Sequence, residues 1–194
     1  MGTLFGLGGM LTANFYALKD YWYPTYLIDN LINIEDFLYG FLLGGIACEL
    51  AEDLLGYKDI RLRKPKHRLT LLLGGGIITL LSLYFLVDVL KLNSIIAYII
   101  PPVVIGLVVL AIRKDLSKIA LLSGFLTAGL AILWFVGIQL FWGDVFSKYW
   151  LLDNLSGYHL FRIPVEEIIF AFALGFGGSC FYETVVGYGE VKAR

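Results

Sequence analysis

Six apolar segments, each long enough to cross a lipid bilayer as a helix, make up most of this 194-residue sequence. A hydrocarbon core of about 30 Å requires about 20 helical residues. Because 59% of the residues are hydrophobic and only 16% are charged, a soluble domain of this length would leave much of its apolar surface in water. We therefore expect a single all-α integral membrane domain over residues 1–194, a polytopic protein of about six transmembrane helices. The expected helices cover roughly residues 2–18, 35–56, 69–90, 94–112, 117–142 and 164–188.

Lysine and arginine predict the orientation of these helices, because positively charged residues of short loops are held on the cytoplasmic side. With six helices, most of the 15 basic residues fall on the side that holds both chain ends, including the run from Lys58 to Arg68. We therefore expect a protein of the cytoplasmic membrane with both termini in the cytoplasm and with the loops 19–33 and 143–163 outside. The first segment lacks a basic n-region, so we expect a retained helix and not a signal peptide. The net charge of −1 argues against nucleic acid as a partner.

Two of the apolar segments are related in sequence. Residues 34–57 read IEDFLYGFLLGGIACELAEDLLGY and residues 165–188 read VEEIIFAFALGFGGSCFYETVVGY, with seven of the 24 aligned positions identical. A Tyr-Trp pair precedes each copy, at Tyr21-Trp22 and at Tyr149-Trp150. Because three expected helices lie between the copies, both copies cross the membrane in the same direction. The sequence thus predicts an internal parallel repeat with units of approximately 1–57 and 124–188, and transporters built from such repeats bind their substrates between the halves.

Each copy opens with two adjacent acids, Glu35-Asp36 in the first and Glu166-Glu167 in the second. One interpretation is structural, since acids in the first turn stabilise the helix dipole, and Asn33 and Pro164 suit helix starts. The other is chemical, because two carboxylates in a low-dielectric site repel each other and one of them tends to keep its proton. A carboxylic acid that is protonated near neutral pH can act as a general acid. The acids alone leave both interpretations open.

Aromatic residues are concentrated around these acids. An interfacial belt of Trp and Tyr explains many of them. The alternative is a cavity whose ring faces stabilise a carbocation, since the face of an aromatic ring attracts cations. We further hypothesise that Pro101-Pro102 kinks the expected helix 94–112 and makes room for a lipid-like ligand.

The start of the second copy resembles a known motif. The sequence Ile163-Pro164-Val165-Glu166-Glu167-Ile168-Ile169-Phe170 follows a loop that contains Trp and Asn, and it precedes Tyr182-Glu183. It looks like the Pro-x-Glu-Glu helix start of the membrane-embedded lycopene cyclases, in which two similar three-helix modules, fused or supplied as two subunits, form one enzyme. The first copy departs from the motif, because Asn33-Ile34-Glu35-Asp36 lacks the proline and the second glutamate.

This resemblance implies a non-redox cyclisation of the ends of an acyclic carotenoid such as lycopene, or related chemistry on another polyprenoid, without a cofactor. A carboxylic acid would protonate the terminal double bond, the neighbouring alkene would attack the cation, and a base would remove a proton. The resemblance further implies that Glu166 and Glu167 are the acid and the base, with Glu35 and Asp36 as the companion pair. It also makes three aromatic residues the candidates for stabilising the cation: Trp150, Phe170 and Phe172. The expected partners are the carotenoid or polyprenoid, membrane lipid and, in an oligomer, a copy of the chain or a second subunit.

Two other functions fit the same residues. A small transporter or lipid-binding protein with parallel repeats would use the acids to handle protons or cations, and a structural membrane subunit would use them only as helix caps. A dinucleotide enzyme is disfavoured, because Gly6-Leu7-Gly8-Gly9 lies in a membrane segment without a preceding strand. The sequence has no closely spaced aspartates for a Mg²⁺-diphosphate site. We interpret Cys48 and Cys180 as buried side chains, and we expect no bound metal.

Overall fold

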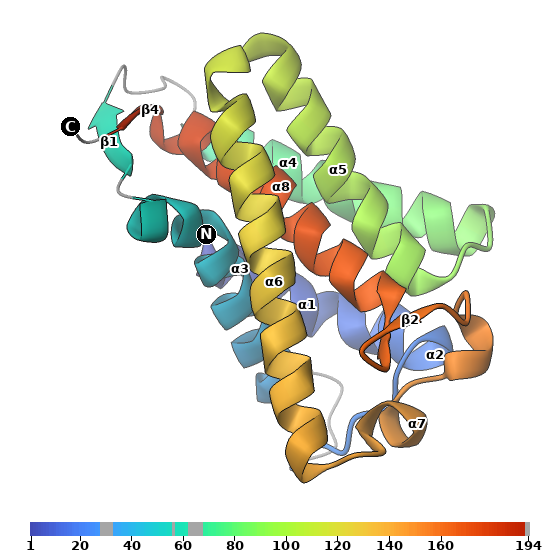
Figure 1. Cartoon of the computed structure of the whole chain (residues 1–194). Helices are drawn as coiled ribbons and strands as arrows, with labels where there is room; N and C mark the ends of the chain where they lie inside the picture. The colour runs from blue at the N-terminus through green and yellow to red at the C-terminus, as the bar shows by residue number, and fades with distance from the viewer. Residues whose placement is uncertain (28–32, 56, 62–67, 193–194) are drawn as a thin grey trace.

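A computed structural model describes residues 1–27, 33–55, 57–61 and 68–192, which are mainly helical (Figure 1). The first part holds α1 (Gly2–Thr12), a π-helical segment η1 (Ala13–Ala17), α2 (Leu18–Asp20) and α3 (Ile34–Leu55). The middle holds α4 (Arg68–Tyr84), a second π-helical segment η2 (Phe85–Val89) and α5 (Ser94–Ile112). The last part holds the 3-10 turns η3 (Lys114–Leu116) and η4 (Leu152–Asn154), with α6 (Ser117–Phe141), α7 (Val145–Tyr149) and α8 (Val165–Val186).

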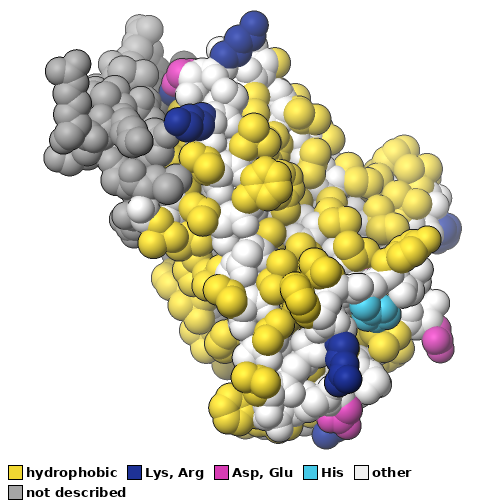
Figure 2. Space-filling view, in the orientation of Figure 1, with side chains coloured by type: hydrophobic (Ala, Val, Ile, Leu, Met, Phe, Trp, Pro, Cys, Tyr) yellow, Lys and Arg dark blue, Asp and Glu magenta, His cyan; other side chains and the backbone are white. Residues whose placement is uncertain are grey.

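Within the described residues, four helical segments are long and apolar enough to cross a membrane: Arg68–Val89, Ser94–Ile112, Lys114–Phe141 and Val165–Val186. On the face shown in Figure 2, apolar side chains cover the middle of the molecule and charged side chains lie towards its ends. The prediction of an all-α integral membrane protein is confirmed at this level. The predicted segment 2–18 is helical too, as α1 to α2, and the predicted segment 35–56 is helical as far as Leu55, where α3 ends. Residues 62–67, most of the basic run, lie outside the described residues.

Two small antiparallel sheets were not predicted from the sequence. One pairs β1 (Tyr57–Arg61) with β4 (Tyr188–Lys192), and the other pairs β2 (His159–Leu160) with β3 (Ile163–Pro164). β4 begins where we expected the last helix to continue to residue 188. The helix ends at Val186 because Gly187 adopts a left-handed conformation, φ 76°, and its backbone N–H donates to the Glu183 carbonyl. A left-handed glycine is a common helix terminator.

Helix α8 is the centre of the packing and contacts α3, α5 and α6. Two of its glycines face neighbouring backbones: a side chain at Gly175 would meet the carbonyl of Ser123 on α6, and one at Gly177 would meet the carbonyl of Pro102 on α5. Close backbone contact at small residues is how helices associate where lipid competes for apolar surface. In the most apolar stretch of α8, 61% of the residues are buried, against 6% in α4. α4 is therefore the peripheral helix.

The helix pairs α1/α3 and α6/α8 pack in matching ways. On α1, a side chain at Gly2 would meet first the carbonyl and then the ring of Phe41 on α3, and on α6, one at Gly124 would meet the ring of Phe172 on α8. Phe41 and Phe172 occupy aligned positions of the two sequence copies. In both helix pairs, a glycine of the preceding helix therefore lies against the aligned phenylalanine.

Segments that precede the two copies also pair with each other. An isolated antiparallel β-bridge joins Trp22 to Trp150. The backbone N–H of Tyr23 donates to the Tyr149 carbonyl at 2.7 Å, and that of Leu151 donates to the Tyr21 carbonyl at 2.9 Å. At the other end of the copies, β1 pairs with β4 so that Asp59 lies opposite Glu190. In both places, corresponding segments of the two copies meet in antiparallel register.

Asp20 connects the first part of the chain to the start of α5. Its carboxylate accepts hydrogen bonds from the Ser94 backbone N–H at 3.0 Å and from the Ser94 hydroxyl at 2.5 Å. Its carbonyl accepts from the side-chain amides of Asn93 at 3.1 Å and Asn154 at 2.9 Å. A carboxylate at a helix N-terminus satisfies free N–H groups and stabilises the helix dipole. Asn93 caps α5 from within the chain of that helix, and Asp20 supplies a second cap from a distant segment.

Replacing Asp20 with alanine should destabilise the folded protein by about 1–2 kcal/mol, the usual cost of losing a helix cap. We expect a lower midpoint in thermal unfolding of the detergent-solubilised protein, followed by intrinsic tryptophan fluorescence. Asp153→Ala is the matched control, because Asp153 is an exposed aspartate in the nearby turn η4. Equal midpoints for the two variants would contradict a capping role for Asp20.

Candidate active site

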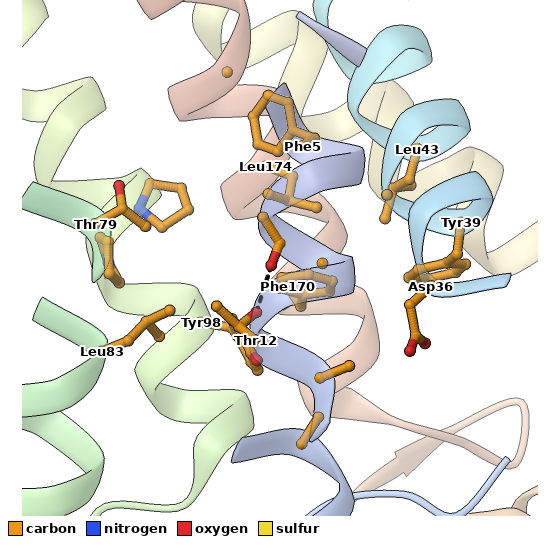
Figure 3. A pocket seen from close by; sticks show the side chains of 18 of the residues that line it. Phe5, Thr12, Asp36, Tyr39, Leu43, Thr79, Leu83, Tyr98, Phe170 and Leu174 are labelled. Atoms are coloured by element: carbon orange, nitrogen blue, oxygen red, sulfur yellow. Dashed lines mark hydrogen bonds between the residues drawn. The ribbon is translucent and has the colours of Figure 1, made fainter. Parts of the chain in front are cut away.

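A cavity of about 540 Å³ lies among the helices and is lined almost entirely by apolar side chains. Figure 3 shows its extent, with α3 residues Asp36, Tyr39 and Leu43 on one side and α4 residues Thr79 and Leu83 on the other. Both sequence copies contribute to its wall at aligned positions. These positions are Asp36 and Glu167, Tyr39 and Phe170, and Leu43 and Leu174, together with Trp22 and Trp150 from the preceding loops.

Asp36 is the cavity acid of the first copy. It lies in the first turn of α3, and its side chain is 4% exposed. The hydroxyl of Tyr26 donates to both carboxylate oxygens, at 3.1 Å to Oδ1 and 2.9 Å to Oδ2. Burial and the hydrogen bond to Asp36 raise the pKa of Tyr26 well above its usual value. Tyr26 therefore stays protonated and serves Asp36 as a hydrogen-bond donor.

Glu167 is the cavity acid of the second copy, with a side chain that is 3% exposed. The indole Nε1–H of Trp150 donates to its Oε1 at 2.5 Å. The backbone of Trp150 is held in turn by the β-bridge to Trp22. Because the hydrogen bond fixes one carboxyl oxygen, the orientation of the carboxyl group within the cavity is set by Trp150.

The first acid of each doublet has a different environment. Glu35 Oε1 accepts a hydrogen bond from the backbone N–H of Leu27 at 2.9 Å, and Glu166 Oε1 accepts one from that of Ser156 at 2.6 Å. Glu35 and Glu166 each bind the loop that precedes their own helix. Neither of them is among the residues that line the cavity. The four predicted acids are thus brought to one region, but they divide into two loop-binding acids and two cavity acids.

Pro164 is the N-cap of α8, one position before the first helical residue at which we expected it. Its conformation, φ −54° and ψ 133°, is extended, and it also forms part of β3. The backbone N–H of Val165 donates to the Tyr158 carbonyl at 3.0 Å, so the loop returns onto the helix start. This turn places Glu166 under the loop and leaves Glu167 on the side of the cavity.

Two of the three aromatic residues predicted from the sequence line the cavity. Trp150 stands beside Trp22, with ring centroids 5.7 Å apart, and Phe170 stands beside Tyr98 at 6.3 Å. Phe172 lies elsewhere: its ring packs on Phe125 at 5.1 Å and does not reach the cavity lining.

Sequence reasoning missed several residues of the cavity wall. Trp22 and Tyr39, with ring centroids 6.4 Å apart, line it near Asp36, and Tyr98 and Phe135 line it on the side of the second copy. The sequence contained a signal for Trp22. The Tyr-Trp pair occurs before both copies, so Trp22 corresponds to Trp150, which is a predicted cation-stabilising residue. Tyr98 and Phe135 had no comparable signal, because they stand in long apolar helices without a matching residue in the first part.

Pro101 and Pro102 lie inside α5, and both line the cavity. This position agrees with the hypothesis that the two prolines make room for a lipid-like ligand. Cys48 and Cys180 are buried free cysteines. In the part of the chain that the structure describes, no group of three His, Cys, Asp or Glu side chains is placed to hold a metal ion.

Two buried acids in the wall of an apolar cavity define a class of protein, an integral membrane protein with an apolar internal cavity. Residues 93–185 match the family model of lycopene cyclase. The match runs from the residue before α5 nearly to the end of α8 and includes Trp150, Glu166, Glu167 and Phe170. The resemblance to lycopene cyclases is therefore confirmed over this part of the chain, and it indicates carotenoid cyclisation. No curated protein sequence and no solved structure matches.

Proposed function

We propose that this protein cyclises the ends of an acyclic carotenoid such as lycopene, or carries out the same chemistry on a related polyprenoid. One observation carries the proposal: the second acids of the two doublets, Asp36 and Glu167, both line a single apolar cavity. A carotene has no polar group for a protein to hold, so a cavity with an apolar wall and only a few polar groups suits it. The family match over residues 93–185 supports the same chemistry.

The reaction needs one proton donor and one proton acceptor. The acid gives its proton to the terminal double bond, and a tertiary carbocation forms. The π electrons of a neighbouring double bond then form the new carbon–carbon bond, which closes the ring and moves the positive charge to a ring carbon. The base removes a proton from the adjacent carbon, and that C–H electron pair becomes the ring double bond. One proton enters and one leaves, so the product is an isomer of the substrate and no oxidant or reductant is needed.

We assign the acid to Glu167 and the base to Asp36. Asp36 has both oxygens hydrogen-bonded to the Tyr26 hydroxyl, and a donor stabilises the charged form of a carboxylate. Among the residues that the structure describes, Glu167 receives one side-chain hydrogen bond, from the Trp150 indole to Oε1. A buried carboxyl in apolar surroundings favours its neutral form. The neutral acid can then hold its proton on the remaining oxygen, towards the substrate.

The aromatic wall would stabilise the cation between these two steps. Trp22 and Trp150 lie beside each other next to Glu167, and Tyr39 lies beside Trp22. The face of an aromatic ring attracts a cation within about 6 Å of its centroid, most strongly for Trp. Preorganised groups of this kind act strongly in a site without water, because they do not reorganise during the reaction.

We also propose that the chain crosses the membrane six times, as two parallel units related by an approximate two-fold axis along the membrane normal. The antiparallel pairing of Trp22 with Trp150, and of Asp59 with Glu190, supports this arrangement, since corresponding segments meet at both ends of the copies. The matching contacts of Gly2 and Gly124 support it as well. Both termini would then lie in the cytoplasm and the acids near the outer surface, as the distribution of basic residues predicts.

The proposal is tested by supplying lycopene to the purified protein in lipid vesicles made in heavy water. We expect a product with one additional deuterium for each ring formed, because the acid delivers a solvent proton while a substrate proton leaves. Mass spectrometry after chromatography measures this gain, and vesicles without protein are the control. Lycopene that is recovered unchanged, or a product that has lost or gained a pair of hydrogens, would contradict a non-redox cyclisation.

A further inference from the structure

The acid-bearing cavity continues into a groove between α1 and α4. On α1 the wall includes Leu4, Gly8 and Leu11, and on α4 it includes Leu72, Gly76, Thr79 and Leu83. The α4 residues are spaced by three or four positions, so they form one face of that helix. Figure 3 shows Thr79 and Leu83 on the far side of the cavity from Asp36 and Tyr39. The groove is therefore a second arm of the same cavity, away from the first copy's acid.

Helices α1 and α4 do not pack closely against each other along this arm. α4 contacts mainly α5, and α1 contacts mainly α3. Large apolar side chains beside the groove are open to the outside, with Leu4 41%, Leu11 46% and Leu80 46% exposed. In a membrane this exterior is lipid. The arm thus joins the hydrocarbon core of the bilayer to the cavity that holds the acids.

Glycines keep the groove wide. A side chain built at Gly8 or at Gly76 would have no other atom within 4 Å, so neither glycine serves a close helix contact. A glycine inside a helix costs about 1 kcal/mol relative to alanine. At Gly75, by contrast, a side chain would meet the ring of Phe181, which is the usual reason for a glycine between helices. Gly8 and Gly76 instead leave free volume along the cavity.

Both walls of the groove contain a π-helical segment at the same end. η1 follows α1 and η2 follows α4. Segments of π-helix are rare and occur often at functional sites. The groove is open along its length towards the lipid.

We infer that a long polyene enters sideways from the bilayer between α1 and α4, and that its chain lies in this groove while one end reaches the acids. Gly8 and Gly76 set the width of the chain that the groove admits. We identify the occupant as a polyene because the groove is continuous with the acid-bearing cavity and because the wall of the groove is apolar. The inference rests on the proposed function for the identity of the polyene.

Gly76→Phe tests the groove, with Gly74→Phe as the matched control. Both glycines stand on α4 with free space around them, but only Gly76 lines the cavity. We expect Gly76→Phe to raise KM for lycopene by about tenfold or more with little change in kcat, because it removes binding and leaves the acids in place. Gly74→Phe should stay within about twofold of the native protein. Equal kinetics for both variants would overturn the inference.

A labelling experiment separates this inference from the proposed function. Gly76→Cys and Gly74→Cys in lipid vesicles are treated with an apolar maleimide, with and without lycopene. The native protein gives the background, because Cys48 and Cys180 are buried. We expect lycopene to slow labelling at position 76 and not at position 74, whether or not cyclisation is observed. If lycopene leaves the labelling at position 76 unchanged, the inference that the polyene lies in the groove is wrong, even in a protein that cyclises lycopene.

Discussion

Glu167→Gln should lower the rate of ring formation by about 10²–10⁴-fold, the range of general acid catalysis. The glutamine amide has nearly the shape of the carboxyl group and still accepts the Trp150 indole N–H through its oxygen, but it has no acidic proton for the double bond. The folded protein should therefore persist while the first chemical step fails. The measurement is the carotenoid content of bacteria that accumulate lycopene and express either protein, with membrane levels compared by immunoblot.

Glu166→Gln is the control, because Glu166 is the adjacent acid of the same doublet and is also buried, at 7% exposure. Its carboxylate binds the Ser156 backbone N–H and does not line the cavity. A glutamine oxygen can accept that hydrogen bond. We expect turnover within about tenfold of the native protein, with any loss arising from a looser loop. A larger loss for Glu166→Gln than for Glu167→Gln would reverse the roles within the doublet.

The sequence predicted where the acids are but not which of them enters the cavity. Adjacent residues on a helix point about 100° apart, so one acid of a doublet faces the neighbouring helices while the other faces the loop. The choice depends on the rotation of α3 and α8 about their axes. That rotation is fixed by contacts such as Gly175 with Ser123 and Gly177 with Pro102, between residues far apart in the chain. The sequence similarity of residues 34–57 and 165–188, by contrast, could be found directly, because it needs only a comparison of two segments.

The aromatic residues show the same difference between local and distant information. Phe170 and Phe172 are both near the acids in sequence, and a two-residue separation on a helix is a rotation of about 200°. Phe170 consequently lines the cavity, and Phe172 packs on Phe125 on another face of α8. The sequence shows Trp22 only in the Tyr-Trp pair that precedes the first copy. Its position beside Glu167's partner Trp150 follows from a backbone pairing across 128 residues, which hydropathy does not reveal.

The pairing of β1 with β4 could not be predicted for a related reason. Each of β1 and β4 has five residues, and neither has a strand next to it in sequence. Strand pairing between segments this far apart is set by the packing of the helices that carry them. The long apolar helices needed no such information, because their length and hydropathy are properties of single segments.

Asp36→Asn should also abolish most ring formation, by about 10²–10⁴-fold, because the amide cannot accept the proton that the ring must lose. Tyr26→Phe should have a smaller effect, about tenfold, since it removes the hydrogen-bond donor and leaves the carboxylate. Glu35→Gln is the matched control, because Glu35 is the neighbouring acid and binds the Leu27 backbone. The same expression assay measures all three. Near-native turnover by Asp36→Asn would show that the first copy supplies no base.

Heavy water distinguishes the acid from the base in these variants. Asp36→Asn retains Glu167, so protonation of the terminal double bond can still occur and reverse. Reversal removes either the new deuteron or a substrate proton, and lycopene recovered from Asp36→Asn should therefore slowly gain deuterium. Glu167→Gln lacks the proton donor, so its recovered lycopene should contain none. Deuterium found only with Glu167→Gln would make Asp36 the acid and Glu167 the base, on the same cavity and with the same overall reaction.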